Sequence, residues 1–75
     1  MERYQDLSGT SGIESYEVGD DWIKVRFRGG YAYTYNHASA GVDHVERMKA
    51  LARAGRGLGT YIGRNVRDAY AAKEP

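Results

Sequence analysis

Aromatic and basic side chains alternate along residues 22–35, and this stretch holds the side chains best suited to binding chemistry. They are Trp22, Lys24, Arg26, Arg28, Tyr31, Tyr33 and Tyr35. Aromatic rings stack on nucleic-acid bases and neighbouring cations hold phosphates, a pairing that single-strand binders use. The stretch therefore predicts a surface that binds RNA or another phosphate-bearing ligand.

Two strands joined at Gly29-Gly30 would carry these residues, because glycines supply the positive φ of tight hairpin turns. Strict alternation along residues 22–28 places one set of apolar side chains on the core face, namely Ile23, Val25 and Phe27. The three tyrosines share a face of the next strand. The hairpin register decides whether that face is also the core face, since a one-residue slip inverts it. Both alternatives stay open: tyrosines packed beneath helices, or tyrosines stacked on a ligand.

A second group of candidates lies in the C-terminal half, around the glycine-rich residues 55–59. The candidate binding residues of this group are Arg53, Arg56, Gly57, Tyr61, Arg64 and Arg67. Backbone amides of a glycine-rich turn before a helix can cradle an anion, and arginines can add charge-assisted hydrogen bonds. The spacing matches neither a Walker motif nor a dinucleotide fingerprint. The alternative is a tight corner between two helices.

No set of residues has the spacing of a catalytic or metal site. The chain has no cysteine, so disulfides and thiolate ligands are excluded. His37 and His44 lie near Asp43 and Glu46, but no third ligand or nucleophile has suitable spacing. We therefore expect a protein that is not an enzyme, with no cofactor and no metal.

The chain of 75 residues is short enough to predict one domain. Alternation predicts strands over residues 13–18, 22–28 and 31–35, with Ile13 and Tyr16 on opposite faces of the first. Helical spacing predicts one helix capped by Ser39 and ended by Gly55, and a second over 61–72 capped by Thr60. The expected fold is α+β: a three-stranded antiparallel meander followed by two helices packed on one face. We expect a flexible N-terminus over residues 1–12, either loose or wrapped along a sheet edge, and a single domain over residues 13–72.

Charge is distributed unevenly along the chain. Residues 1–43 carry four basic and seven acidic side chains, whereas residues 44–75 carry seven basic and three acidic ones. This asymmetry favours either a positive side that attracts phosphates or an attraction between the two halves. No apolar run approaches the roughly 20 residues needed to cross a bilayer, and no signal-peptide core is seen. We expect a cytoplasmic protein without a membrane partner.

The order and spacing of the apolar, tyrosine and glycine motifs resemble the KTSC domain, a module named for its place at the C-terminus of some lysyl-tRNA synthetases. The matching residues are Ile23–Phe27 with Gly30, Tyr33–Tyr35, Val45, Met48, Leu51–Ala52, Ala54–Ile62, Val66–Asp68 and Tyr70. Many family members carry Val-Pro where this chain has residues 36–41. The resemblance covers residues 12–71 and implies the family's fold, in a free-standing bacterial or phage protein. It also implies RNA binding, which has been suggested for the family from the synthetase association.

The leading hypothesis is a non-catalytic module that binds RNA through the tyrosine strand and the basic surface. A second hypothesis is a small homo-oligomer that binds a nucleotide or another small ligand, with Gly55–Gly59, Arg56 and Tyr61 lining the pocket. A third is a protein–protein adaptor that pairs an exposed sheet edge with a partner strand.

Overall fold

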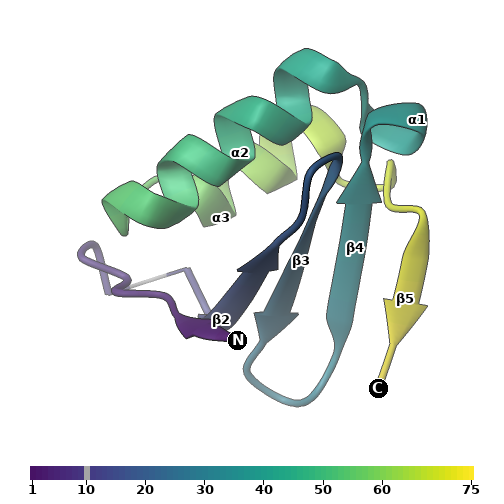
Figure 1. The fold of residues 1–75 in the computed structure, drawn as a ribbon. Coiled ribbons are helices and arrows are strands. Elements are labelled where there is room, and N and C mark those ends of the chain that lie inside the picture. Colours follow the sequence, from purple (N-terminus) through teal and green to yellow (C-terminus); the bar gives the residue numbers. More distant parts are fainter. Residues whose placement is uncertain (10) are drawn as a thin grey trace.

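The computed structural model describes residues 1–9 and 11–75, which form an antiparallel sheet and a layer of helices (Figure 1). The strands are β1 (Glu2–Arg3), β2 (Ile13–Val18), β3 (Trp22–Phe27), β4 (Ala32–Asn36) and β5 (Ala72–Glu74). The helical segments are α1 (His37–Ala40), α2 (Val42–Ala54), α3 (Leu58–Tyr61) and the π-helix η1 (Ile62–Val66). These five strands lie in the order β1-β2-β3-β4-β5. The expected small α+β domain with an antiparallel sheet is confirmed, and the three-strand meander gains an edge strand on each side.

The register of the β3–β4 hairpin places the tyrosines on the apolar face of the sheet. Ile23 pairs with Tyr35, and Val25 pairs with Tyr33. Residues directly opposite each other in an antiparallel pair point to the same face. Tyr33 and Tyr35 therefore lie on the helix-covered face, while Lys24 of the same hairpin points to the other.

Strict alternation fails in β2, where the register shifts between Ile13 and Ser15. Such a bulge inserts one extra residue and returns the following side chains to the other face. Ile13 pairs with Phe27 and Tyr16 pairs with Val25, so both lie on the apolar face. The predicted separation of Ile13 from Tyr16 was wrong for this reason.

Figure 1 shows the helices lying on one side of the sheet, and the buried side chains of the sheet and helices form one core cluster. From α2 it receives Val45 and Met48, both 0% exposed, which pack in one cluster with Ile23 and Val25. Burying side chains of this size stabilises the fold by about 1.5–3 kcal/mol each. In a chain this short, most of the apolar face of the sheet is therefore needed to form the core that stabilises the fold.

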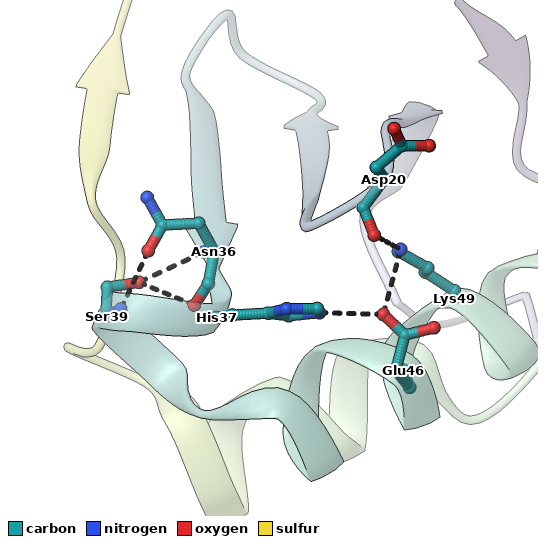
Figure 2. A network of polar contacts seen from close by, with 6 residues as sticks. All are labelled: Asp20, Asn36, His37, Ser39, Glu46 and Lys49. Carbon is teal, nitrogen blue, oxygen red and sulfur yellow. Dashed lines mark hydrogen bonds and ion pairs between the residues drawn. The ribbon is translucent and has the colours of Figure 1, made fainter.

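A capping box begins the short helix α1 directly after β4 (Figure 2). The Ser39 backbone amide donates to the Asn36 side chain at 2.7 Å, and the Asn36 amide donates to the Ser39 hydroxyl at 3.1 Å. The cap residue is thus Asn36, and Ser39 occupies the third helical position, which corrects the prediction that Ser39 is the cap. Gly41, with φ of 96°, separates α1 from α2.

The end of α2 follows the prediction, whereas the second helix does not. Gly55 ends α2 in the left-handed conformation with φ of 78°. The next helical segment begins at Leu58 and ends at Val66, not at Ala72. Beyond it, the Ala71 amide donates to the Thr34 carbonyl at 2.6 Å, and β5 pairs with β4. Pairing the free edge of β4 satisfies backbone groups that a longer helix would have left exposed.

The N-terminal segment is attached to the domain. Glu2 and Arg3 pair with β2, and the Tyr4 side chain is 3% exposed within the core cluster. The Tyr4 hydroxyl accepts a hydrogen bond from the Leu58 amide at 3.3 Å. The described part of residues 1–12 thus contributes an edge strand and a core residue, which corresponds to the edge-wrapping alternative and not to a flexible terminus.

Candidate functional site: an aromatic and basic groove

An open groove of about 500 Å³ lies at the outer end of the apolar sheet face, beside the chain that leaves η1. It is lined by Phe27, Arg28, Tyr31, Tyr33, Tyr35, Ile62, Arg67, Asp68, Tyr70 and Lys73. We call it the tyrosine groove. It unites the hairpin between β3 and β4, the end of η1 and strand β5, so it exists only in the folded chain.

Aromatic rings form the walls of the tyrosine groove. The Tyr33 and Tyr70 ring centroids are 4.9 Å apart, and Phe27 meets Tyr33 edge-on at 5.7 Å. Tyr35 approaches Tyr70 edge-on at 6.4 Å and is 1% exposed, whereas Tyr31 at the rim is 52% exposed. Rings held by such contacts are rigid surfaces that lose little entropy when a planar ligand stacks on them.

The charge of the groove is positive. The Lys73 ammonium lies 4.6 Å from the centroid of the Tyr31 ring and 5.6 Å from that of Tyr33. Arg28 and Arg67 add two more cations, and Asp68 adds one anion, so the lining carries a net charge of +2. Within residues 1–9 and 11–75, neither arginine side chain forms an ion pair or hydrogen bond. Their charges are available to an anion.

The Tyr35 hydroxyl stays protonated in this setting. Burial, and to a lesser extent the neighbouring Tyr33, Tyr70 and Asp68, together raise the pKa of Tyr35 to about 12. Tyr35 therefore acts as a neutral part of the groove floor and does not serve as an anionic base at neutral pH.

Three of the predicted binding residues lie on the opposite, uncovered face of the sheet. The Lys24 ammonium forms an ion pair with Glu74 at 2.7 Å. An Arg26 guanidinium nitrogen donates to the Gly30 carbonyl at 2.7 Å. The Trp22 indole lies against Gly19, where any side chain would collide with it. The structure therefore does not join Trp22, Lys24 and Arg26 with the tyrosines, and the predicted single surface of alternating rings and cations is not formed.

The predicted helical candidates are also dispersed. Arg53 lines a different hollow beside Glu2 and Glu17, and Gly57 lines another beside Gly59 and Thr60. Arg56 and Arg64 are exposed outside the groove.

The Tyr61 hydroxyl is engaged by the His44 ring nitrogen Nδ1 at 2.6 Å. Within one chain, the hollow beside Gly57 is lined by Ser8, Ser11, Gly59 and Thr60, and neither Tyr61 nor Arg56 is among its lining residues. Of the helical candidates, only Arg67 reaches the tyrosine groove.

The sequence candidates omit half of the groove lining, namely Phe27, Ile62, Asp68, Tyr70 and Lys73. Alternation predicts Phe27 on the core face, and Lys73 lies beyond the end of the predicted second helix over residues 61–72. The available signal was the Val66–Asp68 motif with Tyr70, which the family resemblance already included. No local signal identified β5, because three of the four residues 69–72 are alanines that fit a helix equally well.

A second polar cluster connects α1, α2 and the β2–β3 turn (Figure 2). Glu46 lies 2.9 Å from both the His37 ring and the Lys49 ammonium, and Lys49 also donates to the Asp20 carbonyl at 2.8 Å. These hydrogen bonds, first from Lys49 and then from His37, hold the pKa of Glu46 below its usual value. Lys49 is 5% exposed, so we interpret the cluster as a structural contact that holds α1, α2 and the β2–β3 turn together. No group of three or more metal-ligating side chains occurs among the residues described.

Comparison with known proteins gives no match to any family model, to any curated protein or to any solved structure. In the part of the chain that the structure covers, none of the helices has the length and apolar character needed to span a bilayer.

Proposed function

We propose that this protein is a non-catalytic module that binds single-stranded RNA in the tyrosine groove. The observation that carries the proposal is the combination of a partly exposed Tyr31 ring with two arginines that have no partner within the described residues. A base would stack on the tyrosine faces, and its flanking phosphates would bind Arg28 and Arg67. Stacking of this kind contributes about 1–3 kcal/mol per base.

The shape of the groove supports a single strand over a duplex. A volume of about 500 Å³ lies within the range of small-molecule sites, which suits one or two splayed nucleotides. Bases inside a duplex are stacked on each other and present only their edges, so their faces are not free to stack on the tyrosine rings.

We further propose that the chain is a KTSC-like protein that meets RNA in the cytoplasm of a bacterium or of a phage-infected cell. The supporting observations are the motif order in the sequence and the α+β architecture of the folded chain. The proposed role rests on the groove and not on the resemblance alone.

Fluorescence anisotropy with a labelled ten-nucleotide single-stranded RNA tests the proposal. We expect binding at low salt that weakens as salt rises, with a log–log slope of about −0.7 for each phosphate contacted. Arg67→Gln should weaken binding and reduce that slope by about 0.7, since it removes one phosphate contact. Arg64→Gln is the matched control, because Arg64 is also exposed but lies outside the groove.

Tyr31→Leu tests the stacking component. It should cost about 1–3 kcal/mol of binding free energy, because leucine keeps apolar bulk but has no ring face. Trp22→Leu on the opposite face is the aromatic control and should leave binding nearly unchanged. Absence of binding at low salt, or equal losses from groove and control variants, would contradict the proposal. Equal affinity for a free mononucleotide would favour the small-ligand hypothesis instead.

A further inference from the structure

One residue of the tyrosine groove has the wrong charge for a site that only holds phosphates. Asp68 is exposed, lines the groove together with Arg28, Arg67 and the tyrosines, and lies close enough to Tyr35 to raise the pKa of its hydroxyl. Its carboxylate forms no ion pair or hydrogen bond within residues 1–9 and 11–75, even though Arg67 is its neighbour in sequence. An anion in such a place would weaken phosphate binding unless it contacts another part of the ligand.

A carboxylate beside aromatic rings on which a base can stack is suited to the Watson–Crick edge of that base. Its two oxygens accept two parallel hydrogen bonds, so it fits an edge that presents two adjacent donors. Guanine presents its N1–H and N2 amine side by side. Adenine and cytosine place a ring-nitrogen acceptor next to their amine, and uracil places its single N3–H between two carbonyl oxygens. The three other bases would each bring a lone pair toward the carboxylate.

We infer that Asp68 makes the tyrosine groove selective for guanine, with the base stacked on the tyrosine rings and its N1–H and N2 amine donating to the Asp68 carboxylate. This inference rests on the proposed binding of single-stranded RNA and names the base that the site prefers. Unstacked bases of single strands are commonly recognised through this edge together with aromatic stacking.

The test uses five pentanucleotides that differ only at the centre: UUGUU, UUAUU, UUCUU, UUUUU and UUIUU, where I is inosine. The native protein should bind UUGUU about 5- to 150-fold more tightly than UUAUU, the range that a good bidentate contact gives. Inosine keeps N1–H but lacks the N2 amine, so UUIUU should fall between UUGUU and UUAUU. This series needs no variant and thus does not depend on how substitutions affect folding.

Asp68→Asn should abolish the preference for guanine, because the amide offers only one acceptor oxygen. It should leave binding of UUUUU unchanged or slightly tighter, because the groove loses an anion. Asp43→Asn, an exposed substitution in α2 outside the groove, is the matched control and should retain the preference.

The outcomes separate the inference from the function on which it rests. Equal binding of all five oligonucleotides overturns guanine selectivity while RNA binding stands. A guanine preference that persists in Asp68→Asn overturns the assigned role of Asp68. Failure of every oligonucleotide to bind overturns both proposals.

Discussion

The basic side chains on the two faces of the sheet differ in whether they have hydrogen-bond or ion-pair partners within the described part of the protein. On the uncovered face, Lys24 is paired with Glu74, and Arg26 is bonded to the Gly30 carbonyl. At the outer end of the covered face, Arg28 and Arg67 have no such partner within the described residues. Basic side chains that are neighbours in sequence therefore differ in whether they can bind an anion.

The difference shows that exposure alone does not define a binding surface. Hydrogen bonds and ion pairs already made within the protein must be broken before a ligand can use the same groups. Rings covered by the helices are buried in the core. A ligand can reach the rings only where the helical layer ends, at the tyrosine groove. The covered face therefore combines a core at its centre with a candidate site at its margin.

The largest expected effect is on the free energy of unfolding, and it distinguishes Tyr35 at the floor of the groove from Tyr31 at its rim. Tyr35→Ala should lower the free energy of unfolding by about 3–5 kcal/mol, because it leaves a cavity in the core. Tyr31→Ala, at a residue 52% exposed, should cost less than about 1 kcal/mol. Urea denaturation followed by circular dichroism measures both. Equal losses of unfolding free energy would contradict the division of the covered face into a core at its centre and a candidate site at its margin.

An intermediate effect is expected on the uncovered face, at the contact of Gly19 with Trp22. A Cβ at Gly19 would overlap the Trp22 indole, so Gly19→Ala should destabilise the fold by about 1–3 kcal/mol. Because the chain contains one tryptophan, its fluorescence reports the displaced ring directly.

Two comparisons check that explanation of the Gly19 effect. Gly63→Ala, where a Cβ would meet nothing within 4 Å, should be neutral or stabilise by up to about 1 kcal/mol. In a Trp22→Ala background, Gly19→Ala should lose most of its cost, since the two residues are coupled only through the overlap. A full cost in that background would exclude the indole contact as the cause.

The smallest expected effect is the pH dependence of stability that comes from two ion-paired glutamates, Glu46 and Glu74. The Lys24 hydrogen bond lowers the pKa of Glu74, and bonds from Lys49 and His37 lower that of Glu46, both from an ordinary value of 4.5. Because the folded-state pKa is depressed, the stabilisation is present above about pH 4.5 and is lost as pH falls through the folded value. Urea titrations between pH 7 and pH 3 should show a shallower loss for Glu46→Gln and Glu74→Gln than for the native chain.

Glu46 has two donors and Glu74 has one, so Glu46→Gln should flatten the profile more. Exposed pairs contribute little to stability, and added salt should shrink both effects further. A larger change from Glu74→Gln would indicate that the uncovered face depends more on its charges than the helical layer does.

Much of the fold could be predicted because its signals are local. Alternation identified β3 and β4, and Gly55 identified the end of α2. The bulge near Ile13 and the strand β5 could not be found in this way. A bulge changes the face of a residue without changing composition, and β5 forms only because β4 offers an unpaired edge.

The candidate site was predicted in part for the same reason. Alternation grouped the three tyrosines, but only the hairpin register decides whether Lys24 and Arg26 join them, and the observed register sends these cations to the other face. Tyr70 and Lys73 enter the site through long-range packing of β5 against Tyr33. Local spacing carries no information about such contacts.

The sequence by itself determined which segments alternate, where glycines permit turns, and that rings and cations are abundant in a short chain. Only the tertiary structure decided which rings share a groove with which cations. The physical reason is that hairpin register and edge pairing depend on contacts between residues far apart in the chain, and a shift of one residue exchanges the two faces of a strand.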